Sequence, residues 1–157
     1  MMHEQVNQSN IMKIENELKV LRVNLSNLEA WKEEKNLIQS QINAYGSISF
    51  NEIGFKTGGS TYDLTDLLIS DTAKINILES KIDYTEYTYN KMKIYINKLS
   101  EDEQKVINNK YIFTDGNDVS FEKLAKIVKY SKMHTKRLHD SALKKMAYSK
   151  YESLEIA

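Results

Sequence analysis

A cluster of basic side chains in the last third of the chain is the group best suited to hold a ligand. Between residues 123 and 150 there are nine lysines or arginines and one acid, Asp140, a local charge of +8 (9 − 1). The whole chain has a formal net charge of +0. Lysine and arginine donate hydrogen bonds to phosphate oxygens and to guanine O6 and N7, and methionine contacts the thymine methyl group. The pattern therefore indicates a localised nucleic-acid site.

The residues from 120 to 146 are spaced as two helices joined by a three-residue turn. Ser120 and Ser131 are suited to cap these helices, because a serine oxygen accepts a hydrogen bond from a free N–H of the first turn. Apolar residues follow helical spacing in both segments. They are Phe121, Leu124, Ala125, Ile127 and Val128, then Met133, Leu138, Ala142, Leu143 and Met146. A helix pair whose second helix is basic fits the DNA major groove.

Eight residues of the second helix and its cap are the candidate DNA-binding residues: Ser131, Lys132, Met133, His134, Lys136, Arg137, Lys144 and Lys145. We expect Lys132, Met133, Lys136 and Arg137, in the first two turns, to face base edges, and the two later lysines to meet phosphates or water. His134 is expected to touch a phosphate or to be merely exposed. The alternative for the whole set is a solvated basic helix face. Thr135 falls on the inner face and is expected in the core.

Further motif residues lie upstream of this set, between its members and just after it. They are Val106, Ile107 and Tyr111, then Phe121, Glu122, Leu124 and Ala125, then Tyr130, and finally Leu138, His139, Ala142, Leu143 and Met146. In this order and spacing, residues 99–146 resemble the fourth region of bacterial sigma factors. They are more similar still to small phage-encoded, sigma-like late transcription regulators. The resemblance implies double-stranded DNA as the ligand and RNA polymerase as a candidate second partner.

Two features depart from that family pattern. Lys129 stands where these motifs usually carry glycine, and a left-handed backbone costs a non-glycine residue about 1 kcal/mol or more. We therefore expect the turn to open rather than to adopt a positive φ. The segment Thr114 to Val119 is longer than the usual connection and puts the spacing of the upstream helix in question.

Two long helices are predicted ahead of this segment. In the first, Ile11, Ile14, Leu18, Leu21, Leu25 and Leu28 occupy consecutive a and d positions of a heptad repeat, until Lys32 and Lys35 break the seam and Trp31, Ile38 and Ile42 continue it in shifted phase. The second runs from near Asp63, a suitable N-cap, to Leu99. Its a and d positions are Leu68, Asp71, Ile75, Leu78, Ile82, Thr85, Tyr89, Met92, Ile96 and Leu99.

These elements predict an all-α protein. Residues 1–99 would form a long antiparallel, coiled-coil-like helical hairpin around a glycine-containing loop at 45–62, in which Ile48, Phe50, Ile53 and Phe55 alternate. Residues 100–157 would form a small sigma region 4-like helix-turn-helix domain, which begins with a capping box of Ser100 and Glu103. Pairing of the two seams between chains, giving a homodimer, is the alternative.

Other functional classes find little support in the composition. The chain has no cysteine, hence no disulfide framework and no thiolate metal site. No apolar run approaches the roughly 20 residues of a membrane helix, and the polar N-terminus is unlike a signal peptide. We expect a cytoplasmic protein of a bacterial host cell, with no cofactor, metal or enzymatic activity. Two other functions stay open, a DNA-packaging protein similar to small terminase subunits and a helical protein that serves only in interactions.

Overall fold

The computed structural model describes residues 6–47 and 58–153, with backbone only for 46–47 and 58–63. The prediction of an all-α protein is confirmed: the described residues form helices and contain no strand. The elements are α1 (Gln8–Ser47), α3 (Gly58–Ile96), α4 (Glu101–Ile107), the π-helical turn η2 (Asn108–Ile112), α5 (Phe121–Val128), α6 (Lys132–Ala147) and the π-helical turn η3 (Tyr148–Glu152). Across the described ranges, no helix is long and apolar enough to span a membrane.

The chain divides into two compact units, and the division differs from the expected boundary at residue 99. Unit 1 combines Met1–Asn27 with Thr85–Ala157, and unit 2 is Leu28–Tyr84. The start of α1 and the end of α3 therefore belong with α4, α5 and α6. The physical reason is that the seam residues at these helix ends pack into the same core as the C-terminal helices.

Unit 2 has a small apolar core between segments of α1 and α3. Ile38 from α1 packs with Ile75 and Leu78 from α3, and Trp31 and Ile42 cover them. This confirms the apolar face predicted to continue in shifted phase. An ion pair adds to the contact, with Lys35 Nζ 3.3 Å from Glu79 Oε1.

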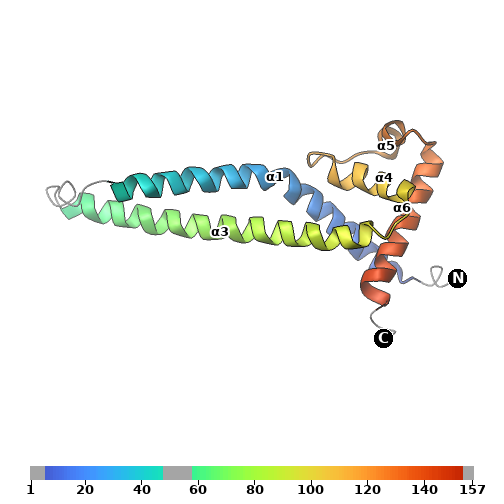
Figure 1. Cartoon of the computed structure of the whole chain (residues 1–157), viewed down its shortest axis with the longest axis horizontal. Coiled ribbons are helices and arrows are strands. Elements are labelled where there is room, and N and C mark those ends of the chain that lie inside the picture. The colour runs from blue at the N-terminus through green and yellow to red at the C-terminus, as the bar shows by residue number, and fades with distance from the viewer. Residues whose placement is uncertain (1–5, 48–57, 154–157) are drawn as a thin grey trace. The chain divides into compact units, whose positions relative to one another are not determined.

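The main core of unit 1 unites the predicted heptad positions with the C-terminal helices. Its buried members from the long helices are Ile11, Ile14, Leu18, Leu21, Met92 and Ile96, and those from the later elements include Leu99, Ile107, Tyr111, Leu143 and Met146. Figure 1 shows α6 running across α4 within this unit, and the two helices are in contact. A smaller cluster of Val106, Val119, Leu124 and Val128 packs α5 against α4, with Leu138 of α6 beside it.

The boundaries of the long helices differ from the predicted ones. Helix α1 continues to Ser47, and α3 begins at Gly58 rather than near Asp63 and ends at Ile96 rather than Leu99. The expected loop at 45–62 is therefore helical at both ends, because backbone hydrogen bonding carries the helices through residues that local propensity assigns to a loop. The alternating residues from 48 to 55 lie outside the described residues.

The three predicted serine caps are confirmed, whereas Asp63, predicted to cap the second long helix, lies inside α3. Ser100 and Glu103 form the reciprocal capping box of α4, and the hydroxyls of Ser120 and Ser131 accept from Lys123 N and His134 N at the starts of α5 and α6. Ile127, in contrast, is 44% exposed, because Leu124, Ala125 and Val128 supply the inner face of α5.

The turn at Lys129 is left-handed, so the expectation of an opened turn is wrong. Lys129 has φ 64° and ψ 38° and closes α5, with its N–H bonded to Ala125 O at 2.8 Å. The next N–H, of Tyr130, bonds to the same carbonyl at 3.2 Å. These two bonds, together with the burial of Val128 immediately before the turn, offset the cost of a left-handed lysine.

The long connection from Thr114 to Val119 is fixed to α1. Gly116 has φ +85°, and a Cβ atom built there would lie 2.6 Å from Ser26 Oγ. Arg22 Nη1 contacts Asp118 Oδ1 at 3.3 Å in the same region. Only glycine combines that backbone angle with so close an approach, so the extra length of this segment serves to seat it against α1.

Candidate nucleic-acid interface

The first two turns of α6 present most of the candidate residues to solvent. Lys132, Met133, His134, Lys136 and Arg137 are all exposed, with Met133 at 67%. Thr135 lies among them in sequence but is fully buried, as predicted, and its hydroxyl donates to Ser131 O at 2.8 Å. This alternation is what an amphipathic helix requires: Thr135 anchors α6 to the core while its neighbours remain accessible.

The exposed candidates make only weak contacts with the rest of the chain. Lys132 Nζ is 3.4 Å from Glu122 Oε1, a surface ion pair of the kind that contributes about 0–1 kcal/mol. Arg137 Nη2 lies 3.6 Å from Met133 Sδ, and the His134 ring stands edge-on to Tyr130. Ser131 uses its hydroxyl to cap α6. An anionic ligand would displace little to reach these side chains.

Three exposed lysines that were not among the candidates lie on the preceding helix and turn: Lys123, Lys126 and Lys129. They precede the candidate set by one helix and share its sign of charge. All three are among the nine basic residues counted between 123 and 150, but the sequence does not indicate which of these residues are accessible to a ligand.

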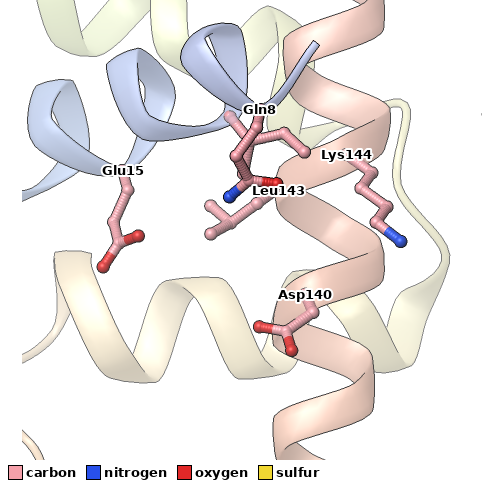
Figure 2. A pocket seen from close by; sticks show the side chains of 6 residues that line it. Gln8, Glu15, Asp140, Leu143 and Lys144 are labelled. Carbon is pink, nitrogen blue, oxygen red and sulfur yellow. The ribbon is translucent and has the colours of Figure 1, made fainter. Parts of the chain in front are cut away.

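The two later lysines of α6 differ in their surroundings. Lys144 is exposed and lies at a groove of about 230 Å³ between the start of α1 and α6. Figure 2 shows the Glu15, Asp140 and Lys144 side chains around this groove, with Leu143 at its wall. The two carboxylates give the groove a mixed charge, and Lys144 is the one cation among the residues that line it.

Lys145 is bound to a buried carboxylate of unit 1, although its own side chain is 42% exposed. Its Nζ donates to Glu103 Oε1 at 2.7 Å, and Ser141 Oγ donates to Glu103 Oε2 at 2.8 Å. Glu103 is 2% exposed. Burial alone would raise the pKa of Glu103, but the hydrogen bonds from Lys145, Ser100 and Ser141 together lower that pKa below its ordinary value. Glu103 thus joins α4 to α6, a role that the capping box did not reveal.

His139, on the buried face of α6, forms a second polar contact within unit 1. Its Nε2 is 2.7 Å from Tyr111 Oη and its Nδ1 is 3.1 Å from Asp140 Oδ1, while the Phe121 ring meets it edge-on. Burial lowers the pKa of His139, and the bond to Asp140 opposes that effect only in part. The histidine of the motif is therefore a core residue that fixes α6 to η2.

Lys110 and Arg22 place two largely buried cations inside unit 1. Lys110 Nζ donates to Val119 O at 2.6 Å and lies over the Phe121 ring, and burial lowers its pKa. The Arg22 guanidinium lies over the Tyr111 ring, 5.7 Å from its centroid. Long-range contacts of this kind leave no signal in local spacing. They hold the helices in place and leave the exposed basic residues as the candidate interface.

No grouping of His, Cys, Asp or Glu among the described side chains could hold a metal ion. Comparison with family models, with curated proteins and with solved structures found no match. The case for a function therefore rests on the residues and contacts of this chain.

Proposed function

We propose that the chain is a sequence-specific transcription regulator of the phage sigma-like type that binds double-stranded DNA. In this proposal α5 and α6 act as a helix-turn-helix, and the N-terminal half of α6 enters the major groove. Residues of α1 and α3 form the long antiparallel hairpin ahead of it. The observation that carries the proposal is the run of exposed Lys132, Met133, Lys136 and Arg137 around buried Thr135.

Separate residues have separate roles in this proposal. Arg137 reads a guanine through its planar fork, which a lysine cannot reproduce, and Met133 meets a thymine methyl group. Lys144 and the α5 lysines contact phosphates, which supply affinity without sequence information. Lys145 is assigned to the contact with Glu103 instead, because that carboxylate already neutralises its charge.

Removal of Arg137 tests the assignment of sequence readout. Arg137→Ala should weaken binding to the preferred site, found by selection from random duplexes, by about 1–3 kcal/mol and leave binding to random DNA nearly unchanged. Fluorescence anisotropy with both duplexes measures this, and Lys19→Ala, which removes an exposed cation of α1, is the matched control. An equal loss on both duplexes would make Arg137 a phosphate contact. No loss on either would place the reading face elsewhere.

The salt dependence of binding tests the phosphate contacts. Each one contributes roughly 0.9 to the slope of log affinity against log salt. Lys144→Ala should lower that slope without changing the preferred sequence, whereas Lys145→Ala should lower the stability of unit 1 and leave the slope unchanged. Binding that is flat between low and physiological salt would contradict the proposal.

RNA polymerase is the proposed second partner.

Mass measurement by light scattering separates the regulator from the packaging alternative, because a ring-forming packaging subunit is a large oligomer and a regulator is a monomer or dimer.

A further inference from the structure

Helix α3 carries a second heptad-spaced stripe on the face opposite its buried seam. The stripe consists of Asp66, Ser70, Ala73, Ile77, Ser80, Tyr84, Tyr87 and Lys91, which follow one another in alternating steps of four and three, and every one of these residues is exposed. Each stripe residue from Ala73 to Tyr87 stands two places beyond a buried seam residue, about 200° around the helix at 100° per residue. Ile77, Tyr84 and Tyr87 are each more than half exposed.

The stripe is self-complementary when two copies of α3 run antiparallel. Layers of an antiparallel pair join an a position of one helix to a d position of the other. In one register the residue numbers of each facing pair add to 157. Asp66 then meets Lys91 of the second copy, Ser70 meets Tyr87, Ala73 meets Tyr84, and Ile77 meets Ser80. Every apolar layer then sets a large side chain against a small one, the arrangement that fills space without overlap.

The polar residues of the stripe favour the same register. Ser80 turns its hydroxyl back to Asn76 O of its own helix, at 3.0 Å, so it presents a small surface to Ile77. Asp66 and Lys91 place opposite charges at each end of the paired segment. A parallel pair would instead set tyrosine against tyrosine and like charge against like charge. Lys74 and Lys81 flank the stripe on one side, and in this register Lys74 of one copy lies near Lys81 of the other. Repulsion between these lysines weakens the pair at low salt.

We propose that this stripe of α3 binds the same stripe of a second copy, antiparallel, about a twofold axis that lies between residues 78 and 79. The paired segment covers residues 66 to 91, roughly 39 Å of helix at 1.5 Å per residue. The occupant is a second copy rather than an unrelated helix, because the size and charge of all four layers match within this one sequence. The inference stands independently of DNA binding.

Cross-linking of cysteine variants tests the register, and the absence of native cysteine gives a clean background. Ala73→Cys and Tyr84→Cys, mixed and mildly oxidised, should form a disulfide-linked heterodimer. Each alone should remain uncross-linked, because positions 73 of the two copies stand 11 residues, about 16 Å, apart along the axis. Leu37→Cys, exposed on α1, replaces Tyr84→Cys in the control mixture. Equal cross-linking of single variants and mixture would overturn the register.

Charge exchange tests the same pairing in the uncross-linked protein. Sedimentation equilibrium should show a dimer, and Asp66→Lys or Lys91→Asp should each raise its dissociation constant about tenfold, since each creates two like-charge contacts across the twofold axis. The double variant Asp66→Lys/Lys91→Asp should restore the original constant, and Glu34→Lys on α1 should not change it. A monomer at all concentrations, or a double variant as weak as the single ones, would overturn the proposal.

Discussion

Unit 1 and unit 2 are stabilised in different ways and carry opposite charge. Unit 1 holds 17 basic and 13 acidic residues, a balance of +4, and unit 2 holds 5 and 9, a balance of −4. Unit 1 buries two apolar clusters and joins its helices through Glu103, Lys110 and His139. Among its described residues, unit 2 buries one apolar cluster of three, Ile38, Ile75 and Leu78. The proposed DNA-binding face belongs to unit 1, which has the larger apolar core and the buried polar contacts between its helices.

The largest expected effect comes from removing buried leucines, one in each unit. Leu124→Ala in unit 1 should lower the free energy of unfolding by about 3–5 kcal/mol, and Leu78→Ala in unit 2 by about 2–3 kcal/mol, because fully enclosed sites relax least around a cavity. Chemical denaturation followed by circular dichroism measures both. A loss below about 0.5 kcal/mol for Leu78→Ala would reject the seam in unit 2.

Loss of the Glu103 charge should cause the next largest loss of stability. Glu103→Gln keeps the size of the side chain but weakens its bonds to Lys145 and Ser141, so we expect unit 1 to lose about 1–3 kcal/mol. Glu79→Gln, which alters the more exposed ion pair with Lys35 in unit 2, is the matched comparison and should cost at most about 1 kcal/mol. Similar losses in the two variants would remove the distinction drawn between the units.

The helix signals of the sequence are sufficient for the seams and the serine caps but not for the start of α3 or for the contacts between distant elements. Ser100, Ser120 and Ser131 were predictable because a cap depends on residues within one turn. The bond of Lys145 to Glu103, and that of Arg22 to Asp118, join residues 42 and 96 positions apart, so nothing in local spacing announces them. The left-handed turn at Lys129 is unpredictable for a related reason, because local propensity gives the cost of a left-handed lysine but not the packing that offsets it.

A fall in pH should weaken unit 1 through His139. Because the pKa of His139 is lowered when folded, the unfolded chain binds the proton first, and stability is lost as pH falls below about 6.5. Glu103 acts separately, below its ordinary value of 4.5. Thermal unfolding at pH 7.5, 6.5 and 5.5 should show this slope, and it should persist in His134→Gln and diminish in His139→Gln. A slope unchanged in His139→Gln would assign it to other groups.

The smallest change in stability is expected at the left-handed turn, and here the substitution should stabilise the protein rather than destabilise it. Lys129→Gly should raise the stability of unit 1 by about 0.5–1 kcal/mol, because glycine adopts positive φ without the strain of a Cβ atom. Lys126→Gly, inside α5, should lower stability by a similar amount. Destabilisation by Lys129→Gly would show that the lysine side chain itself contributes at the turn.

The discontinuity of unit 1 has a consequence for the order in which the chain acquires structure during synthesis. Ile14 and Met146 share one core although 132 residues (146 − 14) separate them, and Glu17 accepts hydrogen bonds from Lys150 and Tyr151. Unit 2 is complete once residue 84 has left the ribosome, whereas the core of unit 1 waits for residues near 150. The basic helix α6 is therefore fixed in place among the last events of folding. A nascent chain that stops short of η3 lacks the hydrogen bonds from Lys150 and Tyr151 to Glu17, which add to the core contacts between α6 and α1.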